Sequence, residues 1–265
     1  MRPSRRAFTL LESVIGLGIF VLLLIVLATM MTGGTALWRD LESSADANLN
    51  LRNLAVRLRQ DLARTSFQEL ATTTVPGGGA HHGDAVWFLS AVDPATGEFM
   101  RKSDGTPFWQ RNLLYYSVVP NGHSELYGYA CAGGADSDGY DDRCPHKMLI
   151  CKQIDSGVPT VITDETSQES LIPAGQIANY LTAPDGFDVS GMSGEPGLEL
   201  TQVVARALVT FRVFPAPGSW GNEVRVDARA VQIRSAEKSV AIGQSPLGEG
   251  KFTTQLEFSV APENP

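Results

Sequence analysis

The hydrophobic pattern of the first 66 residues predicts one long helix. Between Ser13 and Thr32 there is no Lys, Arg, Asp or Glu, and these roughly 20 residues span about 30 Å as a helix, the thickness of a bilayer core. After this run, apolar residues recur at steps of three and four, which indicates one apolar stripe on a helix that continues to about Ser66. The Gly33-Gly34 pair between the two parts costs about 2 kcal/mol of helix propensity, so we expect a bend or local melting there. The stripe consists of Leu37, Leu41, Ala45, Ala47, Leu51, Leu54, Leu58 and Leu62.

Such a stripe has to be covered, and a sheet from the same chain is the economical cover. Later runs rich in β-branched, aromatic and aliphatic residues predict strands that are separated by Pro, Gly, Asn and Asp turns. We therefore predict an α+β fold in which a long N-terminal helix packs on an antiparallel sheet. The predicted strands are residues 85–92, 112–119, 125–130, 146–152, 198–214, 223–235 and 252–260.

Two shorter segments have the composition of turns. Residues 71–83 contain Pro and a run of three glycines, and we expect their His81-His82 pair to be polar loop residues and not a metal site. Residues 215–221 predict a turn that carries Trp220, whose indole we expect in the core.

The longest segment without periodicity is residues 153–197, which are rich in Asp, Thr, Ser, Gly and Pro. We expect one short helical turn at residues 176–181 and otherwise a surface excursion. Segments of this length without regular structure are often functional or mobile, so this one is a candidate partner-binding insertion.

Glu12 stands one turn inside the apolar run, where an ionised carboxylate costs about 2.5–3.5 kcal/mol or more. Such a carboxylate needs a partner. The nearest basic residues, Arg5 and Arg6, lie upstream and on the cytoplasmic side if positive charge stays inside. A cut between Ala7 and Phe8 would free an α-amino group that could pair with the Glu12 carboxylate of a neighbouring subunit.

The stretch Arg5-Arg6-Ala7-Phe8-Thr9-Leu10-Leu11-Glu12, followed by an apolar helix, resembles the N-terminus of type IV prepilins and pseudopilins. The resemblance implies a pilin-like fold, cleavage at Ala7-Phe8 by a prepilin peptidase, N-methylation of Phe8 and a role of Glu12 in subunit assembly. It also implies that the partners are other pilin or pseudopilin subunits, the peptidase and the lipid bilayer. Ala7 departs from the glycine that is commoner before the cut.

On this interpretation the chain has four parts. Residues 1–7 are a leader, 8–34 the transmembrane half of the helix, 35–66 its amphipathic exterior half, and 67–265 a globular β-rich domain with the 153–197 insertion. The protein would cross the inner membrane once, with a cytoplasmic N-terminus and an exterior or periplasmic domain, and would move into a pilus or pseudopilus on assembly.

Within that family, the chain resembles the PilW-like or J-type minor subunits in its length, its Leu11-Glu12 pair and its Arg59-Gln60-Asp61-Leu62 motif. The resemblance therefore implies a structural subunit of a type IV pilus or a type II secretion pseudopilus, and not an enzyme. The sequence has no nucleotide-binding glycine loop, G-x-S-x-G elbow or metalloprotease helix. A membrane-tethered binding module, such as an adhesin or a ligand-capture pilus tip, is the alternative.

Two ordinary interpretations of the N-terminus compete with this one. A secretory signal would be cleaved after its apolar region at an A-x-A-like site, but Leu27-Ala28-Thr29-Met30 is a poor match. A plain signal anchor would have no need for Glu12.

The charge balance argues against nucleic acid as a partner. The chain has a net charge of −8. Loss of residues 1–7 would remove three arginines and no acid, leaving 18 basic and 29 acidic side chains with a net charge of −11. Binding to phosphates requires the opposite sign.

Cys131, Cys144 and Cys151 lie within 21 residues, and the predicted orientation places them outside the cytoplasm, where disulfides persist. We expect one disulfide and one free thiol. The Cys131–Cys144 pairing is favoured over Cys144–Cys151, although the spacing does not decide between them. A zinc site with His123 and His146 is the alternative, but there is no C-x-x-C pair.

The segment between the first two cysteines is crowded with carboxylates, which repel each other unless they are solvated or bridged by a cation. Asp136, Asp138 and Asp142 match the third, fifth and ninth positions of an EF-hand loop if Gly139 is its central glycine. Glycine and proline stand at the first and twelfth positions, so the bidentate glutamate is missing. Calcium and a simply solvated turn both remain open, and some pseudopilins have a calcium loop that this segment resembles.

Overall fold

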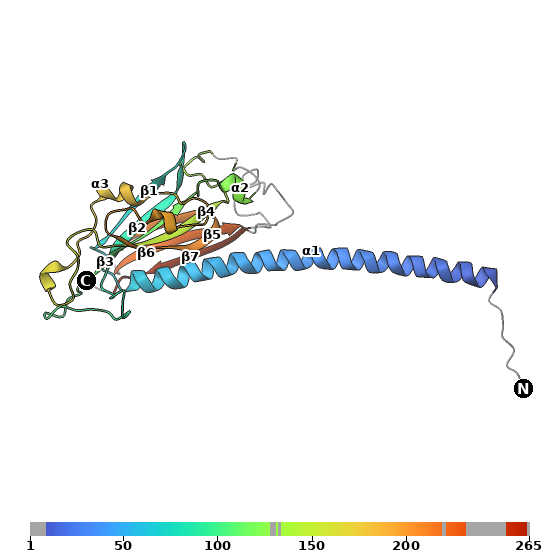
Figure 1. Cartoon of the computed structure of the whole chain (residues 1–265), viewed down its shortest axis with the longest axis horizontal. Helices are drawn as coiled ribbons and strands as arrows, with labels where there is room; N and C mark the ends of the chain where they lie inside the picture. The colour runs from blue at the N-terminus through green and yellow to red at the C-terminus, as the bar shows by residue number, and fades with distance from the viewer. Residues whose placement is uncertain (1–8, 128–130, 132–133, 219–220, 232–252, 264–265) are drawn as a thin grey trace, which may run out of the picture. The chain divides into compact units, whose positions relative to one another are not determined.

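The computed structural model describes residues 9–127, 131, 134–218, 221–231 and 253–263 (Figure 1). The chain divides into two compact units at Ser43, and helix α1 belongs to both. The helices are α1 (Leu10–Ala63), α2 (His123–Tyr127) and α3 (Ala174–Ile177), with short 3₁₀ turns η1 (Glu165–Ser167), η2 (Ala178–Tyr180) and η3 (Ser190–Met192). The strands are β1 (Leu70–Pro76), β2 (His81–Ser90), β3 (Arg111–Val118), β4 (Lys147–Ile154), β5 (Leu198–Gly218), β6 (Gly221–Val231) and β7 (Thr253–Val260).

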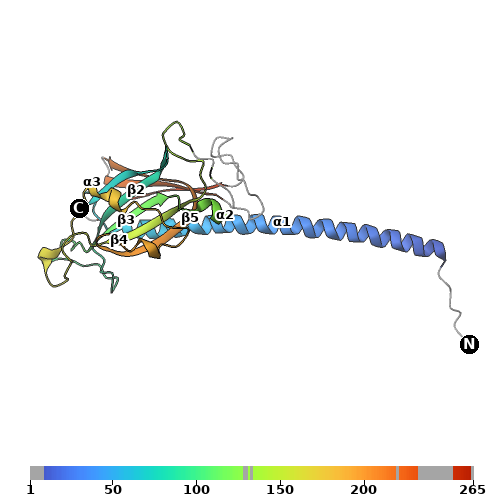
Figure 2. The same ribbon diagram turned by 45° about the horizontal axis from the view of Figure 1, so that its top comes forward.

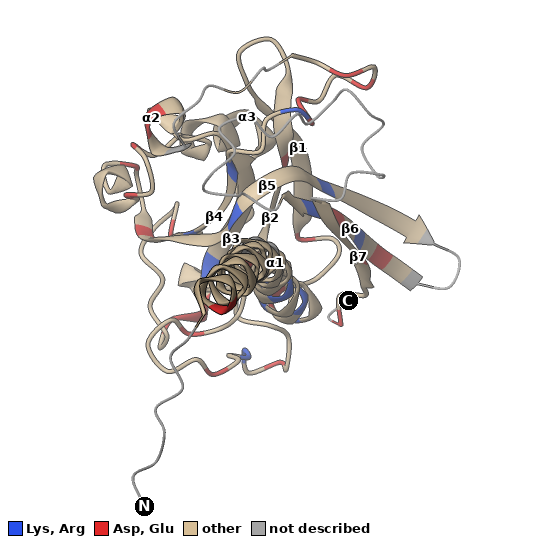
Figure 3. Ribbon diagram, turned by 90° about the vertical axis from the view of Figure 1, so that its right-hand side faces the viewer, with Lys and Arg blue, Asp and Glu red and all other residues tan. Residues whose placement is uncertain are grey.

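The first unit contains an apolar stretch of α1, Leu10–Thr35, with a mean hydropathy of 2.9. Glu12 is the only charged residue in it, so its ribbon is almost entirely tan in Figure 3. Its large apolar side chains are exposed in the chain by itself. At 26 residues and about 1.5 Å per residue, this stretch is long and apolar enough to cross a membrane.

Helix α1 is continuous through Gly33-Gly34, so the local melting expected there does not occur. The propensity cost of about 2 kcal/mol is small beside the cooperative hydrogen bonding of the helix on both sides. Nearby hydroxyl groups also find partners within the helix. Thr29 Oγ1 donates to Val26 O at 2.8 Å and Thr32 Oγ1 donates to Ala28 O at 3.0 Å, which suits surroundings without water.

The second unit is built on one curled antiparallel sheet in which each strand pairs with its neighbours in the chain, in the order β1 to β7 (Figures 1 and 2). This confirms the predicted α+β class at the level of a long helix and an antiparallel sheet. Most predicted strands coincide with observed ones, among them β2 to β7.

The C-terminal part of α1, from Ala47 onward, packs on one face of this sheet, whereas Leu37, Leu41 and Ala45 of the predicted stripe are exposed. Leu51 is 2% exposed and Leu54, Leu58 and Leu62 are fully buried. They share a core with sheet residues such as Tyr115. The prediction that a sheet covers the stripe is therefore confirmed for this part of the helix.

The opposite face of the sheet is also buried. On β3, Leu113 and Tyr115 face the helix, whereas Leu114 and Tyr116 belong to a second core. Residues 153–197 supply the other side of that core through Ile172, Ile177, Tyr180 and Met192. The sheet is thus the middle of three layers, which explains why its central strands β2, β3 and β4 are buried at nearly every position.

The expectation of a surface excursion at residues 153–197 was only partly right, because most of the segment is exposed but a few of its residues are buried in the second core. Its helical turn was right, since α3 and η2 occupy residues 174–180. The Trp87 indole N–H donates to Ile172 O at 2.8 Å. Polar composition misled the prediction because a few apolar side chains, far apart in the segment, are enough to anchor it to the sheet.

Two further expectations were wrong. Residues 71–83 are not one long turn, because β1 pairs with β2 from Leu70↔Phe88 to Pro76↔His81. Residues 125–130 do not form a strand where the structure describes them, because α2 occupies His123–Tyr127. Local hydrogen bonds from Glu125 N and Leu126 N to Gly122 O compete with strand pairing there.

The predicted turn at residues 215–221 is shorter than expected. Strand β5 extends to Gly218, which pairs with Gly221. Trp220 lies outside the described residues.

The curl of the sheet brings the start of β2 against β5. The Asp84 carboxylate accepts a hydrogen bond from Val213 N at 2.8 Å. Gly83 makes this approach feasible, because a Cβ at its position would lie 2.9 Å from Phe211 O, and its φ of 147° is rare for other residues.

Candidate functional site

Glu12 forms a capping box with Thr9 at the start of α1. The Thr9 amide and the Thr9 hydroxyl both donate to Glu12 Oε2 at 2.9 Å, and Glu12 N donates back to Thr9 Oγ1 at 3.3 Å. This reciprocal arrangement satisfies amides that a helix start leaves without partners. Ala7 and Phe8 lie outside the described residues.

The carboxylate that the sequence analysis left in need of a partner thus has a local one. Thr9 was missed as part of this site, although the T-x-x-E spacing of a capping box stands in the sequence. Both bonds to the carboxylate use Oε2. Its second oxygen, Oε1, receives neither of these bonds and faces no basic residue of the described chain in an ion pair.

The end of α1 is joined to the sheet by polar side chains embedded in the core. The Tyr115 hydroxyl donates to Asp61 Oδ2, and Arg57 donates to Gln202 Oε1 at 2.5 Å and to Cys151 Sγ at 3.7 Å. Burial raises the pKa of the Asp61 carboxyl, against the lowering effect of Tyr115 and Arg57. These contacts set the rotation of the helix on the sheet, because each one requires one particular face of the helix.

The structure joins Cys131 and Cys144 in a disulfide, the pairing that the sequence analysis favoured, with a Cα–Cα distance of 5.0 Å. Cys151 is a free, buried thiol in the middle of β4, so the alternative Cys144–Cys151 pairing does not occur. Burial raises the pKa of the Cys151 thiol to about 11. A thiol of this kind is an inert core residue.

Two histidines lie beside the disulfide. His146 Nδ1 is 3.1 Å from Cys131 Sγ, and the ring centroids of His123 and His146 are 5.3 Å apart. Burial and the nearby His123 lower the pKa of His146 to about 4, so this imidazole is neutral near pH 7. The sequence analysis named both histidines in its zinc alternative, and the structure brings them together with the cysteines.

The three candidate calcium ligands face arginines. Asp136 pairs with Arg143 at 3.0 Å, and Arg212 pairs with Asp138 and with Asp142, both at 2.7 Å. Guanidinium groups thus bridge these carboxylates in this structure, in place of the solvent or calcium that the sequence analysis considered. Calcium binding stays a prediction, and an ion would have to compete with these pairs.

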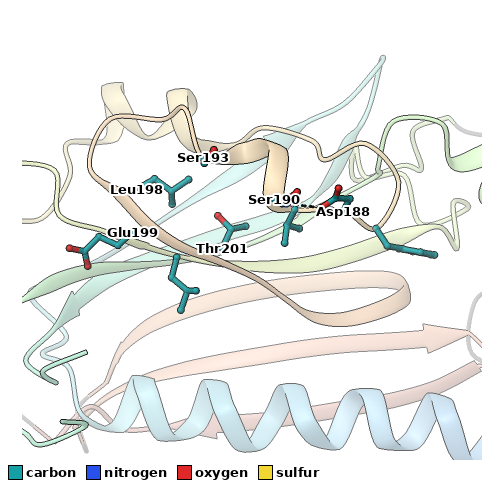
Figure 4. A pocket seen from close by; sticks show the side chains of 9 residues that line it. Asp188, Ser190, Ser193, Leu198, Glu199 and Thr201 are labelled. Atoms are coloured by element: carbon teal, nitrogen blue, oxygen red, sulfur yellow. Dashed lines mark hydrogen bonds between the residues drawn. The ribbon is translucent and has the colours of Figure 1, made fainter. Parts of the chain in front are cut away.

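A pocket of about 390 Å³ lies between η3 and the beginning of β5 (Figure 4). Its two carboxylates already have partners, since Asp188 accepts from Ser190 N at 2.9 Å and Glu199 accepts from Arg111 Nη2 at 2.8 Å. No histidine, cysteine or lysine is among the residues that line it. The pocket is lined by Phe187, Asp188, Val189, Ser190, Ser193, Leu198, Glu199, Leu200 and Thr201.

Comparison with known proteins gives no relative. No family model matches the chain, and no curated protein and no solved structure matches it either. The function therefore has to be argued from the chain's own residues.

Proposed function

We propose that this protein is a minor pilin or minor pseudopilin, a structural subunit that polymerises through its N-terminal helix. One observation carries the proposal: a single unbroken helix joins an apolar stretch that is exposed along its length to a stripe that is buried on an antiparallel sheet. The exposed stretch needs surroundings that the chain itself does not supply. A bilayer before assembly and the helices of neighbouring subunits after it would both meet that need.

The proposed topology follows from charge. Arg5 and Arg6 precede the apolar stretch, and the positive-inside rule keeps them in the cytoplasm. The sheet unit then lies on the exterior side of the inner membrane, in agreement with the disulfide that it contains.

In the proposed assembly step, Glu12 pairs with the α-amino group of Phe8 in an adjacent subunit after cleavage at Ala7-Phe8. The capping box supports this role, because it holds the carboxylate at the helix start through Oε2 and leaves Oε1 to accept from an amine. In lipid such a charge pair is worth more than in water, since the alternative is an isolated buried charge.

The test separates the charge of Glu12 from its capping role. Glutamine serves in a capping box as glutamate does, so Glu12→Gln keeps the cap and removes the charge, whereas Glu12→Ala removes both and Thr9→Val removes the hydroxyl partner. The full-length variants would be expressed in cells with an active prepilin peptidase and filament machinery, and their incorporation into the filament fraction measured. We expect both Glu12 variants to remain in the membrane but to be absent from filaments, and Thr9→Val to be incorporated.

If Glu12→Gln were incorporated as well as the wild type, the proposed charge pairing would be contradicted. Helix capping would then be the remaining role of Glu12. Mass spectrometry of the N-terminus in the same cells tests processing separately. We expect the chain to begin at a methylated Phe8, and an intact residue 1 would overturn the proposal. A subunit that is processed but absent from filaments, and whose exterior unit binds a ligand, would favour the tethered binding module.

A further inference from the structure

Four side chains with sulfur or imidazole donors meet between α2 and β4. His123 begins α2, His146 immediately precedes β4, and Cys131 and Cys144 come from the segment between them. The donor atoms of His123, Cys131 and His146 all lie within 4.8 Å of one another. Cys144 is bonded to Cys131, which brings a fourth donor next to this group of three.

We infer that this cluster is a zinc site whose two thiolates are stored as the disulfide, so that the Cys131–Cys144 bond and a bound Zn²⁺ are alternative states of one site. Two cysteines and two histidines are a common donor set for tetrahedral zinc. Calcium and magnesium prefer oxygen ligands, and none of the four donors is an oxygen. This inference is independent of the proposed assembly function.

The surroundings of the four residues suit a metal ion. Cys144 is 1% exposed and His146 is fully buried, which gives the site a dry inner side. His123 and Cys131 are partly exposed and provide access from solvent. Nδ1 of His146 already faces a cysteine sulfur at 3.1 Å, so the imidazole needs little reorientation to face an ion bound to that sulfur.

The conversion of the disulfide state to the zinc state requires a two-electron reductant, and we take a dithiol as that reductant. Two electrons and two protons from the dithiol open the Cys131–Cys144 bond to two thiols, and the dithiol becomes a disulfide. Zn²⁺ then binds both sulfurs as thiolates and releases their two protons to solvent. With Zn–S distances of about 2.3 Å, the sulfurs of a tetrahedral site lie about 3.8 Å apart, a separation that rotation about the Cα–Cβ bonds supplies.

Both states close the same loop of the chain. The disulfide links residues 13 apart in sequence, and a metal bound to both cysteines would link them in the same way while adding α2 through His123. Zinc binding would therefore preserve the fold of this segment while the disulfide is open, because a metal that binds only the folded chain stabilises it.

The test uses the full chain in detergent and Co²⁺ as a spectroscopic substitute for zinc. The disulfide is reduced with a phosphine, because a thiol reductant would itself bind Co²⁺ as a thiolate. We expect the reduced chain to bind one equivalent of Co²⁺ and to show sulfur-to-cobalt charge-transfer absorption. Added Zn²⁺ should displace the Co²⁺ and remove this absorption. The oxidised chain should show no such absorption. Reduced His123→Gln and His146→Gln should bind at least tenfold more weakly.

Matched controls come from the same chain. Cys151→Ala removes a thiol and His81→Gln removes a histidine, both outside the four-residue set, and both variants should bind Co²⁺ as the wild type does. His123→Gln keeps the test valid if His146→Gln does not fold, because His123 is partly exposed. Absence of charge-transfer absorption in the reduced wild type, or unchanged affinity of His123→Gln, would overturn the inference.

Discussion

The phenol of Tyr115, at the centre of β3, donates a hydrogen bond to the carboxylate of Asp61, two residues before the end of α1. Tyr115 is fully buried. The bond joins the helix to the sheet at the edge of the core, next to Arg57, where a polar group without a partner is costly.

We predict that Tyr115→Phe lowers the free energy of unfolding by about 1–3 kcal/mol, because the half-buried Asp61 carboxylate then loses a donor. Urea unfolding of the full chain in detergent, followed by tryptophan fluorescence, would measure this loss. Tyr115→Phe and Asp61→Asn should couple in a double-mutant cycle by at least about 0.5 kcal/mol. Tyr116→Phe is the matched control, because its hydroxyl donates to Thr182 O on the other face of the sheet; coupling of Tyr116→Phe to Asp61→Asn would contradict the assignment.

Ala207 is the only described residue other than glycine with a positive φ, at 55°. It lies in a bulge of β5, where Lys147↔Leu208 and Leu149↔Ala205 are out of step by one residue. A left-handed conformation costs a residue with a side chain about 1–3 kcal/mol, which glycine avoids.

We therefore predict that Ala207→Gly raises the free energy of unfolding by about 1 kcal/mol, after the extra backbone entropy of glycine is taken into account. Ala205→Gly, two residues away in the same strand and without a positive φ, should instead be destabilising by about 0.5–1 kcal/mol. The same sign of change for both variants in urea unfolding would contradict this explanation.

Residues 153–197 offer a matched pair of isoleucines. Ile172 is 1% exposed in the second core, and Ile162 in the same segment is 49% exposed. We predict that Ile172→Ala costs about 2–5 kcal/mol of stability, whereas Ile162→Ala stays within about 0.5 kcal/mol of the wild type. If the segment did not pack on the sheet, neither change would alter the free energy of unfolding. Thermal or urea unfolding of the two variants therefore tests whether the segment forms part of the second core.

The stability of the oxidised chain should depend on pH through His146. Its pKa falls from an ordinary value of 6.5 to about 4 in the folded chain, because burial disfavours the charged ring. The folded state then binds fewer protons than the unfolded state between these values. The contribution of His146 to stability is therefore fully present above pH 6.5 and is lost as the pH falls toward 4.

We expect the difference in unfolding free energy between the wild type and His146→Gln to shrink as the pH falls through this range. Urea unfolding at several pH values with the disulfide intact would measure it. A difference that does not change with pH would show that His146 has the same pKa in the folded and unfolded chain.

Local patterns were sufficient for several features. The apolar run and the stripe of Leu51, Leu54, Leu58 and Leu62 predicted both parts of α1, because a helix repeats its environment every three or four residues. Alternation and β-branched content located β2 to β7 for the same kind of reason. The pairing of Cys131 with Cys144 was favoured, but spacing alone left the choice open.

Other features depend on residues that are distant in sequence. No residue close to Asp136, Asp138 or Asp142 in the sequence predicts their partner Arg212. This arginine lies in β5 and forms ion pairs with Asp138 and Asp142. The strand β1 was missed because its pairing partner, and not its composition, makes it a strand.

By itself the sequence determined the apolar helix, the single charge at Glu12 within it, the amphipathic stripe and the positions of most strands along the chain. Each of these features depends on residues that are close together in the sequence. Only the tertiary structure decided that residues 153–197 close the second face of the sheet and that two histidines meet the disulfide. These outcomes depend on which apolar surfaces are still uncovered once the sheet has curled. The set of uncovered surfaces is a property of the whole chain and not of any one segment.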